Sequence, residues 1–354
     1  MPDIDLWYLE NLVCPVERAR LHWDGACLVS DAGRRYPVIE GIPIMLVEER
    51  DQTIGVAAAT MRCARETLAA GIARDEFYVA TLGISEVQRA EVARLVAAGN
   101  SRIEPVVSYL VAATNGIAYK SLVGHLTEYP IPKLRLPAAN PGELLLDIGC
   151  NWGRWCMAAA KLGYAAVGID PSLGSVLAAR RVSRSMGLDI RFVVGDARFL
   201  PFREGLFDRV FSYSVLQHFS KPDCIEALKE VGRTLKPDGS SFIQMAHAIG
   251  VRSFQHQARR RFREARDFEV RYWTIPEMSV AFEREIGPAK ISVDCYFGLG
   301  LQKSDGHLMK PFPRLAMRLS EALRFMSRFF TPLVYAADSI YVSSRRIENA
   351  FSKT

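Results

Sequence analysis

The stretch LLLDIGCNWG, residues 144–153, decides the fold of this chain. Its leucines and Ile148 form the continuous apolar run of a strand buried on both faces, and its glycines allow a tight turn into a helix. After this stretch, apolar strands alternate with amphipathic helices along the chain. The further predicted strands are AVGID (166–170), RFVVGD (191–196), RVFSYS (209–214), SSFIQMA (240–246), AKISVDCYFGLGL (289–301) and DSIYVSSRR (338–346). This alternation predicts an α/β fold with a doubly wound, seven-stranded, mostly parallel sheet covered by helices on both faces.

Three carboxylates end the first three of these strands, namely Asp147, Asp170 and Asp196. Ligands of doubly wound sheets bind at the carboxyl ends of the strands, so we expect all three to face one ligand. Asp147, inside the glycine turn, would repel a pyrophosphate but suits a cationic amine and a sulfonium. Asp170 can accept both hydroxyls of a ribose, and Asp196 can accept the exocyclic amine of adenine beside the backbone N–H of Ala197. The nicotinamide fingerprint G-x-G-x-x-G is broken, because Asn151 stands at its second glycine.

The order of these motifs, followed by FDRVF (207–211) and LKPDG (235–239), resembles class I S-adenosylmethionine-dependent methyltransferases. The ubiquinone and menaquinone biosynthesis type is the most similar. The resemblance covers about residues 142–246 and implies a Rossmann-like fold with S-adenosyl-L-methionine as cofactor. It implies that the glycine loop surrounds the methionine part, that Asp170 holds the ribose, and that Asp196 with Ala197 reads adenine. The expected cofactor-binding residues are Asp147, Gly149, Cys150, Asn151, Gly153, Asp170, Pro171, Asp196, Ala197 and Ser212.

Taken singly, each of the three aspartates is more typical of a helix N-cap or a turn, and only their common register favours cofactor binding. Cys150 also has a second interpretation, as a buried structural thiol.

The fourth strand leads into Tyr213, Gln217 and His218, which we expect near the reacting methyl group. Methyl transfer is an in-line displacement that mainly needs alignment, with a base only where the acceptor must lose a proton. His218 is the candidate catalytic base; the alternative is a histidine that orders the loop. Tyr213 and Gln217 could orient an acceptor, although an aromatic residue at a strand end is more often core. The motifs of amino-directed and cytosine-carbon nucleic-acid methyltransferases are absent from the sequence.

Residues 1–50 alternate short β-like runs with turns at Gly25, Gly33 and Gly41, which predicts a small β module. The sequences LVCP and RYPVIEGIPIML in it resemble the zinc-ribbon-like activator proteins of tRNA and protein methyltransferases. Such modules hold zinc through two C-x-x-C knuckles. Here Cys14 alone stands at a suitable position, since Glu17 and Ser30 replace its partners, so we expect a degenerate module without metal.

Residues 51–137 predict a helical connector, because they are rich in alanine and carry helical apolar spacing up to a proline-rich boundary. Residues 138–354 then form the methyltransferase domain, with insertions at about 248–275 and 302–335. The first insertion contains the basic cluster 259–266, which favours a solvated helix face over recognition of an acidic or phosphorylated acceptor. The second contains a basic, aromatic, amphipathic helix at 313–335, which either packs on its own domain or makes a peripheral membrane contact.

The composition narrows the function further. The 354 residues carry a formal charge of +6, which is modest for a nucleic-acid partner, and seven cysteines without a C-x-x-C pair, which is typical of a reduced cytoplasmic protein. We expect no signal peptide and no membrane span, but a location at the inner membrane face fits the amphipathic helix. The sequence leaves the oligomeric state open.

These observations predict an S-adenosylmethionine-dependent transferase of biosynthesis that methylates a small molecule or a glycan or lipid intermediate, at oxygen. One alternative is an RNA or protein methyltransferase that uses the N-terminal module for recruitment. The other is a non-catalytic regulatory protein that only binds the cofactor.

Overall fold

The computed structural model describes residues 4–52, 54–71, 77–99, 103–298, 300 and 302–347. Its centre is a seven-stranded sheet in the order β10-β11-β9-β8-β5-β6-β7. The strands are β5 (Leu144–Ile148), β6 (Ala165–Asp170), β7 (Arg191–Val194), β8 (Phe207–Ser212), β9 (Leu235–Ala246), β10 (Ala289–Cys295) and β11 (Ser339–Arg345). β5 to β9 pair in parallel, whereas β11 is antiparallel to both of its neighbours. The predicted α/β class with a mostly parallel seven-stranded sheet is confirmed.

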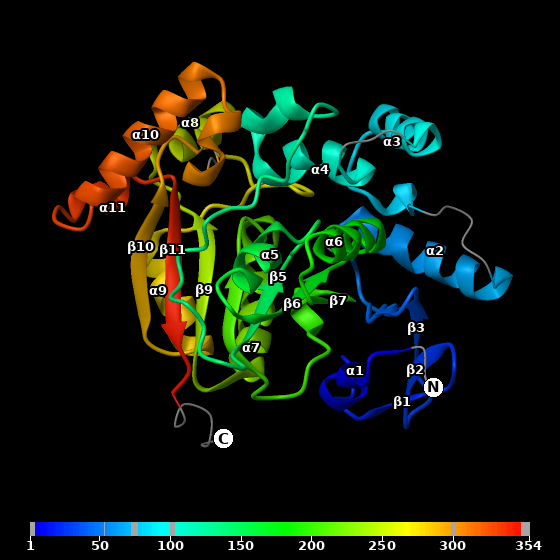
Figure 1. Ribbon diagram of the computed structural model, residues 1–354. Helices are drawn as coiled ribbons and strands as arrows, with labels where there is room; N and C mark the ends of the chain where they lie inside the picture. Colours follow the sequence, from blue (N-terminus) through cyan, green and yellow to red (C-terminus); the bar gives the residue numbers. More distant parts are fainter. Residues whose placement is uncertain are drawn as a thin grey trace.

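Helices cover both faces of this sheet, as Figure 1 shows. One face packs against α7 (Lys221–Thr234) and α9 (Ile275–Glu285), with Leu228 and Phe282 in its core. The other packs against α5 (Arg154–Ala160) and α6 (Leu173–Ser185), with Trp152 fully buried among them. Because both faces are covered, the central strands β5, β6 and β7 are mostly apolar, which is the pattern that made them visible in the sequence.

The N-terminal β module is a four-stranded antiparallel sheet of β1 (Leu21–Trp23), β2 (Cys27–Ser30), β3 (Arg35–Ile39) and β4 (Ile42–Pro43), preceded by α1 (Leu6–Asn11). Gly25, Gly33 and Gly41 all have positive φ, as their predicted turns require. The module lies against edge strand β7 (Figure 1). There the Tyr8 hydroxyl donates to the Phe192 carbonyl at 2.8 Å, and the Met45 amide donates to the Val194 carbonyl at 2.7 Å.

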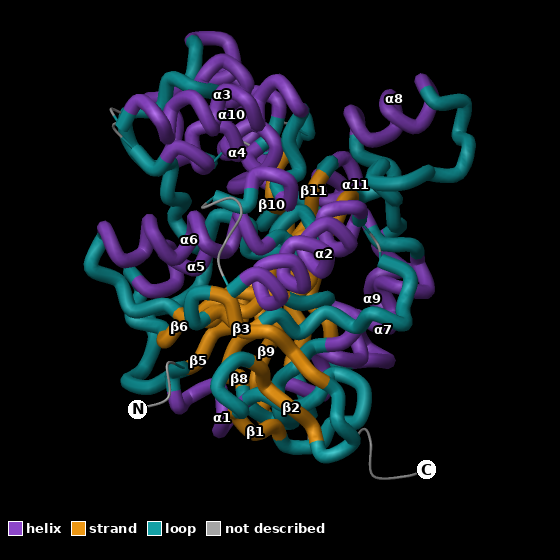
Figure 2. The backbone as a smooth tube through the Cα atoms, turned by 90° about the vertical axis from the view of Figure 1, so that its right-hand side faces the viewer, coloured by secondary structure: helices purple, strands orange, loops and turns teal. Residues whose placement is uncertain are grey.

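The connector contains α2 (Gly55–Ala70), α3 (Glu86–Ala98) and α4 (Pro105–Asn115). The two insertions contribute α8 (Val251–Arg259), α10 (Pro311–Met326) and α11 (Pro332–Ala336). Both views place α3, α4, α8 and α10 beyond the carboxyl ends of the parallel strands, at the opposite end of the molecule from β1 (Figures 1 and 2). The connector and the insertions therefore surround the edge where ligands of this fold bind.

The basic cluster 259–266 differs from the expected solvated helix face, because α8 ends at Arg259. Beyond it the chain turns, with positive φ at Arg261 and Phe262, and Arg263 pairs with Glu269 at 2.7 Å. The left-handed turn ends the helix before its arginines can line one face. Within the described ranges no helix is long and apolar enough to cross a membrane.

Candidate cofactor site

A cavity of about 550 Å³ opens where β5, β6, β7 and β8 end. The predicted site residues that line it are Gly149, Asn151, Asp170, Pro171, Asp196, Ala197 and His218. They come from four loops that are adjacent in space because the strands before them are neighbours in one sheet. The common register expected from the sequence thus brings these seven positions together.

The loop after β5 contributes Gly149 and Asn151 to the lining of this cavity. Gly149 has φ of 73°, and a Cβ placed on it would lie 2.2 Å from Val215. Asn151 also has a left-handed backbone, with φ of 45°, which asparagine tolerates better than most residues. Its amide donates to Asp170 Oδ2 at 2.9 Å, so the loop is tied to the end of β6.

Asp170 lines the cavity and is 8% exposed. Each of its carboxylate oxygens accepts one backbone N–H, Oδ1 from Ser172 and Oδ2 from Asn151, both at 2.9 Å. A carboxylate oxygen has two lone pairs, so both oxygens can still accept a ligand hydroxyl. Burial raises the pKa of Asp170 to about 6, although the two backbone hydrogen bonds oppose the shift.

Asp196 at the end of β7 is held by Arg198, which donates to Asp196 Oδ2 at 2.7 Å and also pairs with Asp223 at 3.0 Å. The Arg198 amide donates to Asp196 Oδ1 at 2.8 Å. These bonds fix the carboxylate in place beside Ala197, and they use most of its lone pairs. The sequence did not indicate this partner.

Four predicted cofactor residues lie outside the lining of the cavity, namely Asp147, Cys150, Gly153 and Ser212. Asp147 differs most from expectation. Successive residues of a strand point to opposite faces, and its side chain points to the α5 face, where Cys156 Sγ donates to it at 3.2 Å. It is 1% exposed, and burial raises its pKa to about 7.

The other three residues lie in or next to the glycine loop after β5 and contact the sheet instead of the cavity. Ser212 donates to the Ile148 carbonyl at 3.0 Å, and the Cys150 thiol fills the space that a Cβ on Gly168 would need. Gly153 packs against Phe192, where a Cβ would approach the ring to 3.2 Å.

The connector contributes wall residues that the motifs did not reveal. Ile54, Gly55 and Val56 at the start of α2, with Leu82, Gly83 and Arg89, line the cavity. Arg89 Nε is buried and has no hydrogen-bond partner among the described residues. Phe268, from the first insertion, completes the wall near His218. No local sequence signal marks these residues, because tertiary packing alone brings them here.

His218 lines the cavity. Its Nδ1 lies 2.8 Å from the Phe268 carbonyl, which can only accept, so Nδ1 carries the proton and Nε2 keeps its lone pair. The ring stacks on Phe268 with centroids 3.9 Å apart. Burial lowers the pKa of His218 to about 4, with the Arg271 charge adding to the shift. The imidazole is therefore neutral near pH 7.

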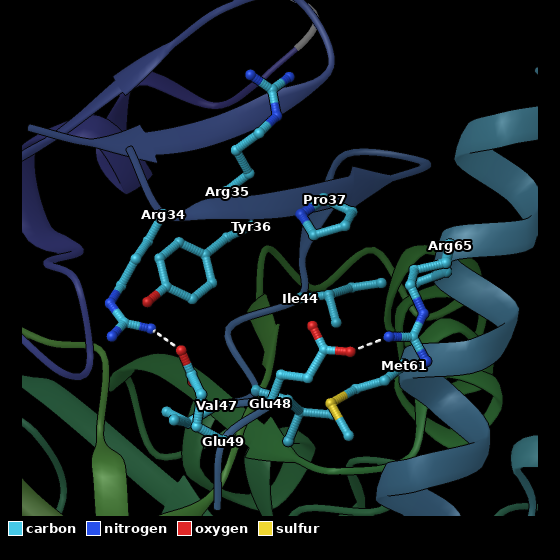
Figure 3. Close-up of a pocket in the computed structure, with 12 residues that line it drawn as sticks. Arg34, Arg35, Tyr36, Pro37, Ile44, Val47, Glu48, Glu49, Met61 and Arg65 are labelled. Carbon is cyan, nitrogen blue, oxygen red and sulfur yellow. Dashed lines mark hydrogen bonds and ion pairs between the residues drawn. The ribbon is translucent and has the colours of Figure 1, made fainter. Parts of the chain in front are cut away.

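A different cavity, of about 230 Å³, lies between the β module and α2 (Figure 3). Arg34 pairs there with Glu49, and Arg65 pairs with Glu48. No predicted site residue in the described part of the chain lines this cavity. Figure 3 shows that Arg34 and Arg65 each already pair with a glutamate of the cavity wall. We therefore do not assign a ligand to it.

Residues 145–239 match a family described as a methyltransferase domain. The match confirms the methyltransferase domain that the motifs predict. It also supports S-adenosyl-L-methionine as the cofactor. One similar curated protein is the probable tRNA methyltransferase 9B of Bos taurus, which is 35% identical over 32% of this chain and 24% of its own length. Another is the ubiquinone biosynthesis O-methyltransferase of Caulobacter vibrioides, which is 35% identical over 29% of this chain and 40% of its own length. This chain therefore spans less than half the length of these relatives.

Two solved structures show a partial likeness. One is a complex of the Trm112 methyltransferase activator with a methyltransferase of Haloferax volcanii, at TM-score 0.43 and 19% identity, covering 61% of this chain and 86% of that one. The other is phosphoethanolamine N-methyltransferase 2 of Haemonchus contortus with S-adenosyl-L-methionine, at TM-score 0.43 and 17% identity, covering 75% of this chain and 61% of that one.

Proposed function

We propose that the protein is an S-adenosylmethionine-dependent methyltransferase that acts on a small molecule or a glycan or lipid biosynthetic intermediate, at oxygen. The observation that carries the proposal is the single cavity into which the ends of β5, β6 and β7 bring Gly149, Asp170 and Asp196. The matched methyltransferase domain contains all three of these residues.

The residues present fit this cofactor. Gly149 and Asn151, which line the cavity, are assigned to the methionine part, and the open lone pairs of Asp170 suit two ribose hydroxyls. Asp196 and Ala197 are assigned to adenine, with Arg198 holding the carboxylate in place. The cofactor supplies a methyl group already activated on sulfur. The chain's own part is then to align the acceptor and to exclude water.

His218 is proposed as the base for a hydroxyl acceptor. The acceptor oxygen would form the new bond to the methyl carbon as the carbon–sulfur bond breaks, and its proton would pass to the free Nε2 of His218. The electron pair of the broken bond stays on sulfur, so the charges balance. Phe268 supports this role, because its carbonyl fixes the tautomer that leaves Nε2 open.

Replacement of His218 by glutamine should lower kcat about 100-fold or more, the usual contribution of a general base, with little change in cofactor affinity. The pKa of about 4 predicts that wild-type activity shows no His218 titration near pH 6.5 and loses this base only as pH falls towards 4. A pH–rate profile of both proteins checks this. An unchanged kcat in His218→Gln would assign the residue to loop order instead.

Incubation of the protein with methyl-labelled cofactor and fractionated extracts tests the activity itself. Label in the small-metabolite, sugar or lipid fraction supports the proposal. Label in RNA or protein would favour the alternative of a macromolecular acceptor, which the similarity to a tRNA methyltransferase keeps in view. Cofactor binding without label in any fraction would favour a regulatory protein that only binds the cofactor.

The N-terminal module is proposed as a degenerate, metal-free relative of a zinc ribbon that stabilises the catalytic domain. Cys14 Sγ lies 3.1 Å from the Tyr36 hydroxyl, which supports a structural role for this thiol. The hydrogen bonds of Tyr8 and Met45 to β7 support a permanent attachment to the sheet edge.

A peripheral membrane contact is proposed for residues 313–335. Large apolar side chains are exposed along α10, the turn after it and α11: Leu315, Leu319, Phe325, Met326, Phe329, Phe330 and Tyr335. Arg318 and Arg328 are exposed among them. An apolar patch with interspersed cations suits the interface of an anionic bilayer.

The wild-type protein should float with phosphatidylglycerol vesicles and much less with neutral phosphatidylcholine vesicles. Replacement of Phe329 and Phe330 by serine should reduce flotation severalfold, because each buried apolar group adds to the binding energy. Val87→Ser on α3, which is 75% exposed, is the matched control and should float like the wild type. Failure of the wild type to float with anionic vesicles would remove the membrane contact.

A further inference from the structure

A second cavity, of about 230 Å³, adjoins the cofactor cavity at the end of β8. Tyr213 and Ser214 line both cavities and form their shared wall. The remaining walls come from the ends of α4, β9 and β10, the loops after β8 and β10, the start of β11 and the first insertion. A molecule held here would therefore have its nearest reactive group beside the cofactor cavity.

Asp338 lies on the wall of this second cavity, directly before β11. Because β11 is antiparallel to β9, its first residue lies at the edge where the parallel strands end, opposite Ala246. Asp338 is 3% exposed, and its Oδ1 accepts the Ser253 amide at 2.8 Å. Its Oδ2 is buried without a partner, and no lysine or arginine among the described residues pairs with this carboxylate. A buried carboxylate without a countercharge is unfavourable unless a ligand supplies one.

Gln217 adds a second open acceptor to the same cavity. Its side-chain nitrogen donates to Ser214 Oγ at 2.8 Å, while its oxygen is buried without a partner in the described structure. The neighbouring Gln244 has a partner on each of its side-chain polar atoms, since it accepts from the Ser214 amide at 2.7 Å and donates to Ser339 Oγ at 2.6 Å. The two unpartnered polar atoms, Asp338 Oδ2 and Gln217 Oε1, are therefore both hydrogen-bond acceptors. The first belongs to a carboxylate that has no countercharge. A protonated amine matches them, because it offers three donors, no acceptor and a positive charge.

We propose that this cavity holds the methyl acceptor and that Asp338 binds a protonated amine of that acceptor, a specificity that rests on the methyltransferase function proposed above. The amine is an anchor and not the methylated atom, because a protonated nitrogen has no lone pair to attack with. The acceptor is therefore an amino alcohol in chemical class, whose hydroxyl reaches past Tyr213 and Ser214 towards His218.

A matched pair of probes tests this assignment on the full chain without cofactor. Vicinal trans-aminocyclohexanol and vicinal trans-cyclohexanediol share a skeleton and differ in one charged group. Calorimetry should find that the amino alcohol binds the wild type about ten- to a hundredfold more tightly, as expected for a charge-assisted hydrogen bond. Asp338→Asn should remove this preference, whereas Glu264→Gln, at an exposed carboxylate, should keep it.

Asparagine keeps the Oδ1 that accepts the Ser253 amide, so Asp338→Asn should fold with an unchanged or higher melting temperature. Equal affinities of the two probes, absence of binding by either, or an undiminished preference in Asp338→Asn would overturn the amine site. Cofactor affinity is measured on the same samples. Amine binding that depends on Asp338, in a protein that does not bind S-adenosyl-L-methionine, would contradict the proposed function and leave the amine site standing.

Discussion

Replacement of Asp170 by alanine should weaken binding of S-adenosyl-L-methionine by about 1.5–3 kcal/mol, roughly 10- to 150-fold, the range for hydrogen bonds to a charged group. Asp170 lines the proposed cofactor cavity, and each of its carboxylate oxygens has one open lone pair. Its removal also frees the amides of Asn151 and Ser172, so a melting curve should accompany the binding measurement by calorimetry.

The pH dependence of the same binding gives a second readout. With the pKa of Asp170 at about 6, the ionised form dominates above pH 6, and the carboxyl gains a proton as pH falls below it. The protonated form has lost its charge and one acceptor position, so wild-type affinity should fall between pH 7 and pH 5. The alanine variant should lack this part of the pH dependence.

Asp189→Ala is the matched control, because Asp189 is exposed and outside the cavity lining. Its cofactor affinity should equal that of the wild type. If Asp170→Ala binds the cofactor as tightly as Asp189→Ala, the cavity is not the cofactor site.

Asp305→Ala should lower the free energy of unfolding by about 3–5 kcal/mol, because it leaves a buried guanidinium without its countercharge. Asp305 is 1% exposed and accepts from Arg154 Nη2 at 2.8 Å and from the Tyr119 hydroxyl at 2.5 Å. Arg154 is the first residue of α5, directly after the glycine loop. The cluster thereby links the cofactor loop, the connector and the second insertion.

Denaturant unfolding measures this effect, and a double variant shows its origin. Arg154→Met with Asp305→Leu removes both charges and should recover most of the loss, since apolar groups of similar size tolerate burial. Lys229→Ala breaks the exposed pair with Glu226 and should change stability much less. Equal stabilities of Asp305→Ala and Lys229→Ala would contradict the claim that the buried pair ties these segments together.

Much of the candidate cofactor site could be predicted from the sequence, because its residues follow strands whose apolar runs are continuous. Asp170, Asp196 and the loop at Gly149 reach one cavity since parallel neighbours end at the same edge. The cofactor role of Asp147 stays a prediction, and its side chain lies outside the lining of the cavity. Alternation along a strand says that Asp147 and Ile148 face opposite ways, but only the tertiary structure shows that Asp147 faces α5 and that Ile148 lines the cavity.

The amino-acid sequence by itself determined the sheet, its helices and the order of the strand-end carboxylates, because these depend on local periodicity and on turns a few residues long. Only the tertiary structure decided what surrounds them. Arg89 comes from the connector, Phe268 holds the imidazole of His218, and Asp338 reaches the carboxyl edge through an antiparallel strand. Such contacts join residues far apart in the chain, and they exist only once the sheet has formed and the flanking segments have packed over its edge.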